Sequence, residues 1–88
     1  GDYLLTQFQQ ALSGHSLVKE VRGLGLMIGI ELKQPCPQLV DQALAKKLLL
    51  NVTAGSVIRL LPPLIINQDQ ADRIITTVCD CIDELEHE

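Results

Sequence analysis

The sequence predicts an α+β domain, a two-layer sandwich in which a small, mainly antiparallel sheet packs against helices. Three observations lead to this fold class. Three segments carry apolar residues at helical spacing, two pairs of short segments alternate as strands do, and small residues join the strands of each pair. The predicted order is α-β-β-α-β-β-α, and because no linker or low-complexity tract interrupts it, we treat residues 1–88 as one domain.

The N-terminal segment has the apolar spacing of one helical face. Its apolar residues at positions 4, 5, 8, 11 and 12 predict a helix over residues 3–12, and Ser13-Gly14 provides a stop. His15 follows in a loop, without a cysteine or carboxylate at metal-ligand spacing, so we expect a solvated side chain.

A first strand pair is predicted over residues 17–22 and 26–32, as a hairpin or a sharply bent pair with its turn at Gly23-Leu24-Gly25. In the second strand, one face is expected to carry Leu26, Ile28, Ile30 and Leu32. A phosphate-binding glycine loop opens a helix, whereas this Gly-x-Gly opens a strand. We therefore interpret it as a turn.

A second helix is predicted after the rigid connector Pro35-Cys36-Pro37, with Pro37 in its first turn. Its buried stripe is expected to be Leu39, Val40, Ala43, Leu44 and Leu48. Its outer face is expected to carry Gln38, Asp41, Gln42 and Lys46. Nothing near Cys36 would activate its thiol, so we expect a structural or exposed residue.

Residues 49–53 and 57–61 predict a second strand pair, joined in antiparallel fashion through Ala54-Gly55-Ser56. Asn67 followed by Gln70 is a capping-box pattern and predicts the start of the last helix. The apolar stripe of this helix is expected to be Ala71, Ile74, Ile75, Val78, Ile82 and Leu85. Its acidic end, with Glu84, Glu86 and Glu88, is expected to fray.

Two cysteines on the last helix, Cys79 and Cys81, raise the question of a metal. At this spacing their side chains point about 200° apart, so they are expected to pack separately rather than share an ion.

Arg59 stands in an apolar segment, Val57-Ile58-Arg59-Leu60-Leu61, which Pro62-Pro63 ends. At strand periodicity, Ile58 and Leu60 point to one face and Arg59 to the other. Two interpretations are open. Arg59 is either an edge-strand arginine whose stem covers the core while its head meets water, or a planar fork that grips a ligand carboxylate with two parallel hydrogen bonds.

Composition argues against several functions. The net charge is −4 and the longest basic cluster is Lys46-Lys47, whereas a nucleic-acid surface needs a basic stripe. One Phe, one Tyr and no Trp leave little for stacking single-stranded bases. No apolar run reaches the roughly 18 residues of a membrane span. The three cysteines form no disulfide framework, which favours a reducing cytosol.

No catalytic or metal constellation follows from spacing. The histidines, His15 and His87, lie in a loop and at the terminus, where neither provides a base for a nucleophile. Asp80, Asp83 and Glu84 are expected to be solvated on the last helix. The residues alone therefore indicate an anion-binding strand in a packed domain, and no reaction.

Two blocks of the sequence, at the expected interval, resemble a known family. VRGLGLMIGIEL, residues 21–32, is similar to the strand pair that opens the C-terminal domain of class III aminotransferases. LLNVTAGSVIRLLPPL, residues 49–64, resembles the acetylornithine aminotransferase branch of that family. The resemblance extends over nearly the whole chain, from about residue 3 to residue 85.

The resemblance implies a parent enzyme several times longer than this chain. Such enzymes are cytoplasmic, pyridoxal-phosphate-dependent homodimers of fold type I, with a large cofactor domain and a small domain that the C-terminus completes. The chain would be the C-terminal segment of that small domain. The parent would transfer an amino group from N-acetylornithine to 2-oxoglutarate, giving glutamate, in arginine biosynthesis. Ornithine and succinyl-diaminopimelate stay open as alternative amino donors.

By the same resemblance, Arg59 matches the arginine that binds the α-carboxylate of the substrates. Transamination needs the Cα–H bond held perpendicular to the cofactor ring, and a bidentate grip on the carboxylate fixes that orientation. Asn51, Thr53 and Gly55 lie just before the strand, in what is expected to be a loop, and two interpretations stay open: these residues either line the same pocket or serve ordinary turn chemistry.

The family's Schiff-base lysine, its pyridine-pairing carboxylate and its phosphate loop belong to the large domain. Lys19, Lys33, Lys46 and Lys47 have no matching context, so we expect no catalytic residue, no bound cofactor and no activity in this chain alone. Two functions of other classes stay open: an amino-acid-binding module that senses through Arg59, and an assembly domain in which Arg59 pairs with a protein carboxylate.

Overall fold

A computed structural model describes residues 2–25, 27–46, 48, 50–61 and 65–87 of the chain. These residues form elements in the order α-β-β-α-β-β-α, as predicted. In chain order the elements are α1 (Asp2–Ala11), β1 (Val18–Leu24), β2 (Met27–Leu32), α2 (Leu39–Ala45), β3 (Asn51–Thr53), β4 (Val57–Leu60) and α3 (Gln68–Glu86). The prolines expected to end β4 and the predicted strand residues Leu26 and Leu49 lie outside the described residues.

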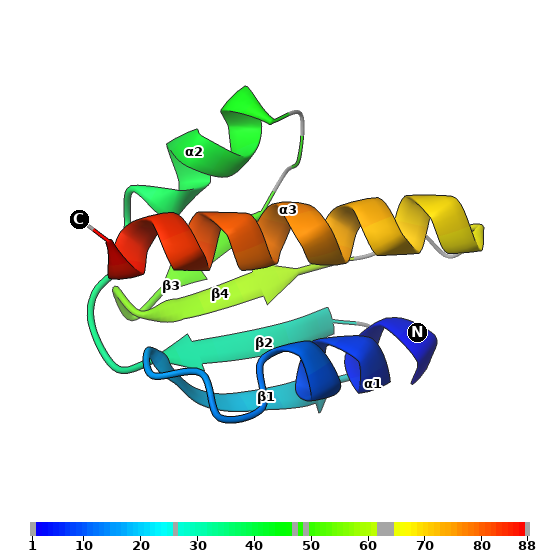
Figure 1. The fold of residues 1–88 in the computed structure, drawn as a ribbon, viewed down its shortest axis with the longest axis horizontal. Helices are drawn as coiled ribbons and strands as arrows, with labels where there is room; N and C mark the ends of the chain where they lie inside the picture. The colour runs from blue at the N-terminus through cyan, green and yellow to red at the C-terminus, as the bar shows by residue number, and fades with distance from the viewer. Residues whose placement is uncertain (1, 26, 47, 49, 62–64, 88) are drawn as a thin grey trace.

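The described strands form one antiparallel sheet in the order β1-β2-β4-β3 (Figure 1). Both predicted hairpins are confirmed, since β1 pairs with β2 and β3 pairs with β4. The pairing of β2 with β4 joins the hairpins and was not predicted. It makes β4 an inner strand, so the interpretation of Arg59 as an edge-strand residue is wrong.

The first hairpin turns later than predicted. Gly23 and Leu24 belong to β1, and of the three predicted turn residues only Gly25, with φ 66°, follows the strand. A Cβ at Gly23 would lie 3.1 Å from Leu5 Cδ2 on α1. Gly23 therefore permits the close approach of a helix to the strand, rather than a reversal of the chain.

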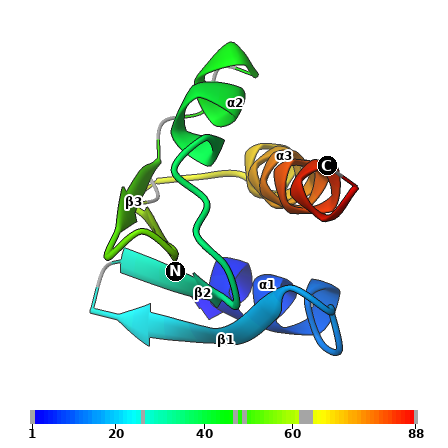
Figure 2. The same ribbon diagram turned by 90° about the vertical axis from the view of Figure 1, so that its left-hand side faces the viewer.

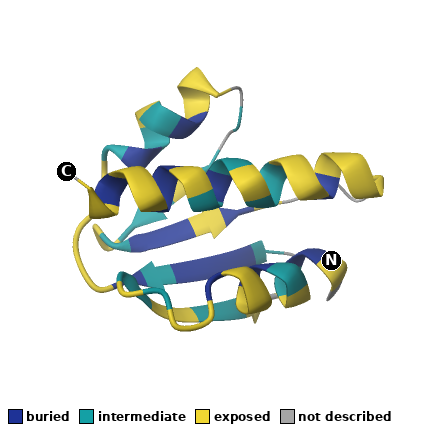
Figure 3. Ribbon diagram, in the orientation of Figure 1, coloured by how far each residue is buried: buried dark blue, intermediate teal, exposed yellow. Residues whose placement is uncertain are grey.

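The helices lie to one side of the sheet (Figure 2), and the core fills the space between. The inner strands β2 and β4 are largely buried (Figure 3). Ile28, Ile30 and Leu32 are at most 4% exposed and join one core cluster, which confirms their predicted common face. Phe8 of α1 is fully buried in the same cluster. The prediction of a small antiparallel sheet packed against helices is thus confirmed.

The middle helix, α2, is shorter than its predicted stripe. It ends at Ala45, so Leu48 lies beyond it, although Leu48 still packs partly against the core. Leu39 and Ala43 are buried, but Leu44 is 55% exposed, because so short a helix presents few residues to the core. Gln42, expected outside, is half-buried, and its Oε1 is buried without a partner among the described residues.

The capping box of α3 is present as predicted. Asn67 Oδ1 accepts the Gln70 N–H at 2.8 Å, and Gln70 Oε1 accepts the Asn67 N–H at 3.1 Å. The predicted stripe is buried at Ala71, Val78, Ile82 and Leu85, and partly buried at Ile74 and Ile75. No helix of the described chain is long and apolar enough to cross a membrane.

The cysteines pack separately, as expected. Cys36 and Cys81 are buried and Cys79 is half-buried. Burial raises the pKa of Cys79 to about 11, so its thiol stays protonated at neutral pH. Cys81 joins the core, which the stripe of α3 did not predict.

The expected fraying of the acidic end is wrong for the described residues. The helix α3 continues to Glu86, and Lys46 Nζ contacts both carboxylate oxygens of Glu84, at 3.0 and 3.2 Å. Ser16 Oγ donates a hydrogen bond to Glu86. Side chains from distant parts of the chain therefore hold this end of the helix.

We predict that Asn67→Ala lowers the free energy of unfolding by about 1 kcal/mol, because an N–H at the start of α3 loses its acceptor. Denaturant unfolding of the protein measures this loss. Asn67→Asp is the matched control, since aspartate caps as well as asparagine and should leave stability near the wild-type value. Equal losses in the two variants would contradict a capping role.

Candidate functional site

Arg59 lies on the face of the sheet opposite the helices. Its neighbours Ile58 and Leu60 are 0% and 3% exposed and point into the core, whereas Arg59 is exposed. Within the described part of the chain, its guanidinium has no hydrogen-bond or ion-pair partner. The strand thus presents a positive charge that no described residue neutralises.

Strand register places four residues in one row across this face. Arg22 pairs with Gly29, Gly29 with Arg59, and Arg59 with Asn51. Residues directly opposed in antiparallel strands project to the same side. Gly29 contributes no side chain between the two arginines in the row, and their Cα atoms are about 10 Å apart at two strand spacings.

We call this surface the open face, and define it by the row and its neighbours of the same orientation. It consists of Glu20, Arg22, Gly29, Glu31, Asn51, Thr53, Val57 and Arg59.

Of the three residues predicted to line the pocket of Arg59, only Asn51 lies directly opposite it. Asn51 and Thr53 belong to β3, as the strand predicted over residues 49–53 requires, and not to the loop in which the resemblance placed them. Asn51 is directly opposite Arg59, and because its Oδ1 accepts the Val52 N–H at 2.9 Å, its amide NH2 is left as a donor. Thr53 lies opposite Val57, and Gly55, with φ 81°, lies in the hairpin turn at the other end of β4.

An ion cluster lies beside Arg59 on β1 and β2. Arg22 Nη1 is 3.1 Å from Glu31 Oε1 and also bonds Glu20, and Lys19 Nζ is 3.7 Å from Glu31 Oε2. The hydrogen bond from Arg22 is the main cause that lowers the pKa of Glu31. Sequence reasoning missed this cluster, although the alternation of Glu20 and Arg22 opposite Glu31 in a predicted hairpin was a usable signal.

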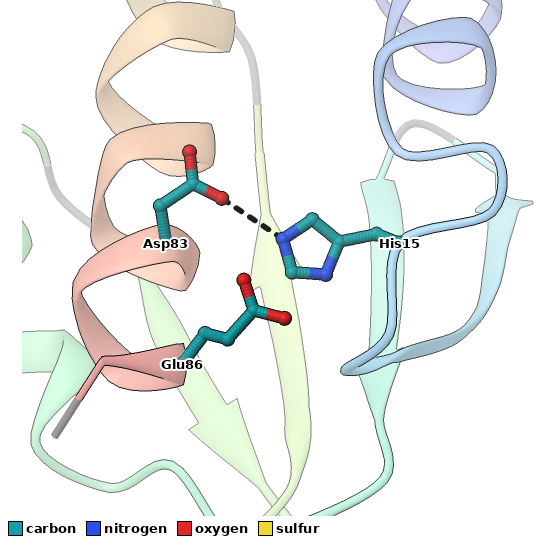
Figure 4. A group of neighbouring side chains, drawn as sticks. All are labelled: His15, Asp83 and Glu86. Atoms are coloured by element: carbon teal, nitrogen blue, oxygen red, sulfur yellow. Dashed lines mark hydrogen bonds and ion pairs between the residues drawn. The ribbon is translucent and has the colours of Figure 1, made fainter.

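A second cluster, of His15, Asp83 and Glu86, joins the loop after α1 to the end of α3 (Figure 4). His15 Nε2 lies 2.9 Å from Asp83 Oδ1. The side chain of His15 is only 14% exposed, so its expected solvation is wrong, and Asp83 and Glu84 are likewise engaged rather than simply solvated. The partners are 68 residues apart, a separation that no spacing rule covers.

The ligand atoms of this cluster lie within 4.8 Å of one another, but its hydrogen bonds argue against a metal ion. His15 Nδ1 accepts the Leu17 N–H at 3.1 Å, so in the neutral ring Nε2 carries the proton and donates it to Asp83. A metal ion on Nε2 would need the lone pair of an unprotonated Nε2. In a metal-bound histidine the other ring nitrogen carries the proton and donates it in a hydrogen bond, whereas Nδ1 of His15 accepts one. The cluster is therefore a tether between two elements.

The described residues do not fit pyridoxal phosphate, the cofactor that the resemblance implies. That cofactor needs a lysine for its covalent link and backbone donors around its phosphate. Among the described lysines, Lys19 and Lys46 are engaged by Glu31 and Glu84, and Lys33 is exposed directly after β2. In the Gly-x-Gly segment, Gly23 and Leu24 end β1 and only Gly25 follows the strand, so the segment opens no helix.

Comparison with known proteins supports the resemblance. The profile of the family described as aminotransferase class-III matches residues 1–82. The chain is 41% identical to an acetylornithine aminotransferase of Methanothermobacter thermautotrophicus over 97% of this chain and 22% of the relative. It is 48% identical to acetylornithine aminotransferase 1 of Bordetella pertussis over 85% of this chain and 19% of the relative.

Solved structures of aminotransferases are also similar to this chain. An ornithine delta-aminotransferase of Plasmodium falciparum superposes with a TM-score of 0.83 at 26% identity, over 94% of this chain and 22% of that one. The chain thus spans about a fifth of the length of these relatives. The chain belongs to the class-III aminotransferase family.

Proposed function

We propose that residues 1–88 are one domain, the C-terminal small domain of an acetylornithine aminotransferase with the fold of type I enzymes. The parent would transfer an amino group from N-acetylornithine to 2-oxoglutarate in arginine biosynthesis. The family match over residues 1–82 supports this proposal, as do relatives that bear the name acetylornithine aminotransferase. The short span of the chain within those relatives supports its assignment as one part of a larger enzyme.

In this enzyme, Arg59 binds the α-carboxylate of the amino-acid and oxo-acid substrates. The observation that carries this role is a guanidinium on the open face that contacts no described residue through a hydrogen bond or ion pair. A bidentate grip by its planar fork fixes both the position and the rotation of the carboxylate, and so the direction of the Cα–H bond. Asn51, directly opposite, would add its amide donor, while contacts from Thr53 and Gly55 stay predictions.

The remaining parts of the site would come from the rest of the parent. The large domain would hold pyridoxal phosphate, and a second copy of the parent would complete a cytoplasmic homodimer. Leu61 and Ile65, which follow β4, are 68% and 93% exposed, as expected for side chains that other parts of an enzyme cover.

We predict that Arg59→Ala, in the full-length enzyme that carries this sequence, raises KM for 2-oxoglutarate roughly 10- to 100-fold. This corresponds to the loss of about 1.5–3 kcal/mol of charge-assisted hydrogen bonding. Arg59→Lys keeps the charge but loses the planar fork of the guanidinium, so its KM should lie between those of the wild type and Arg59→Ala. Steady-state kinetics measures both, with Arg73→Ala, an exposed arginine on α3, as the charge-matched control. The same KM in Arg59→Ala and Arg73→Ala would contradict the proposal.

The isolated 88-residue chain should not bind pyridoxal phosphate covalently and should have no transaminase activity. The physical reason is that the described residues provide neither the lysine context nor the phosphate donors. Absorbance spectra followed by borohydride reduction and mass spectrometry test this, with the full-length enzyme as positive control. A cofactor fixed to Lys19, Lys33, Lys46 or Lys47 would overturn the prediction.

The isolated chain should also self-associate or bind a hydrophobic dye, because Leu44, Leu61 and Ile65 are strongly exposed. Dye fluorescence and light scattering measure this, and Leu61→Ser with Ile65→Ser should reduce both signals. A dye-silent monomer would count against the assignment of the chain as part of a larger enzyme.

A further inference from the structure

The position of Glu31 relates it equally to two arginines. Gly29 lies directly between Arg22 and Arg59, and Glu31 is two residues further along β2 on the same face. Glu31 is therefore the diagonal cross-strand neighbour of both arginines. Long side chains reach across such diagonals, so Glu31 is a possible partner for either.

In the structure, Glu31 is held by the β1 side. Its Oε1 is 3.1 Å from Arg22 Nη1, and its Oε2 is 3.7 Å from Lys19 Nζ. Both carboxylate oxygens thus contact cations of β1, on the side of β2 away from β4. Arg59, on the other diagonal, has no partner among the described residues.

We propose that Arg22 is a positioning residue for the carboxylate site. By holding Glu31, it keeps an internal carboxylate away from Arg59 and leaves that guanidinium free for the carboxylate of a ligand. This inference rests on the proposed role of Arg59.

The physical basis is competition. A protein carboxylate tethered one strand away has a high effective concentration at Arg59, so, once released, it competes with any ligand in solution. Arg22 prevents this by offering Glu31 a closer hydrogen-bonded partner. The ion pair thus has a purpose beyond stability, to which exposed pairs contribute little.

Glu20 provides the matched control. It also bonds Arg22 and carries the same charge as Glu31. However, Glu20 lies on β1, two strands away from Arg59, and is not its diagonal neighbour. Removal of Glu20 therefore changes the net charge in the same way without removing the competitor.

The test uses the full-length enzyme that carries this sequence, with 2-oxoglutarate as the probe. Arg22→Gln should raise KM about three- to fivefold, the range of an exposed ion pair, with kcat unchanged. Adding Glu31→Gln should restore KM, whereas adding Glu20→Gln should not, although the two double variants have equal net charge. Arg22→Lys should keep the wild-type KM because lysine still holds Glu31.

The single variant Glu31→Gln is a control in case the Arg22 variants misfold, because it leaves Arg22 in place. It breaks the same ion pair as Arg22→Gln but removes the competitor, so KM should not rise. If Glu31→Gln raises KM for 2-oxoglutarate as much as Arg22→Gln does, or if the two double variants have the same KM, then Arg22 acts only structurally and the inference fails. If Arg59→Ala leaves KM unchanged, the proposed role of Arg59 fails instead, so the two failures are distinguishable.

Discussion

The pairing of β2 with β4 is the interaction on which both the core and the site depend. Each hairpin forms between strands that are close in sequence, but only this pairing joins them into one sheet. It sets Ile30 against Ile58 on the helix side and Gly29 against Arg59 on the open face. A slip of one residue would turn Arg59 into the core, where an unpaired guanidinium is strongly unfavourable. The same strand register thus buries the isoleucines and exposes the arginine.

Charges on the open face, together with Lys19 beside it, are arranged so that Arg59 is the cation without a contacting carboxylate among the described residues. Lys19 and Arg22 balance Glu20 and Glu31, two charges of each sign in contact. Arg59 has no such balance among the described residues. An overall acidic chain, with a net charge of −4, therefore still carries a local positive charge, on which the proposed carboxylate would bind. In this proposal the local arrangement of charges matters more than the total charge.

Local patterns in the sequence predicted local structure well. Alternation in residues 57–61 assigned Ile58 and Leu60 to the core and Arg59 to the other face, and the Asn67 capping box marked the start of α3. These features depend on neighbours in the chain, whose physical preferences are readable. Asn51 was also named as a neighbour of Arg59, although in a loop rather than opposite it in β3.

Contacts between distant segments could not be predicted in the same way. Alternation gives the faces of a strand but not its partner, so the order β1-β2-β4-β3 was open. His15 and Asp83 meet only because the loop after α1 reaches the end of α3. The prediction for Leu44 was wrong for a different reason: Leu44 lies in the last turn of the short helix α2, and there its side chain is 55% exposed instead of packed on the core.

The most direct test of the central claim is calorimetric titration of glutarate into the full-length enzyme that carries this sequence. Glutarate has carboxylates but no amino or oxo group, so it reports carboxylate binding without reaction. We expect binding that is lost in Arg59→Ala and retained in Arg73→Ala. Equal affinity in the wild type and Arg59→Ala would show that Arg59 is an exposed arginine without a ligand, and would contradict the account.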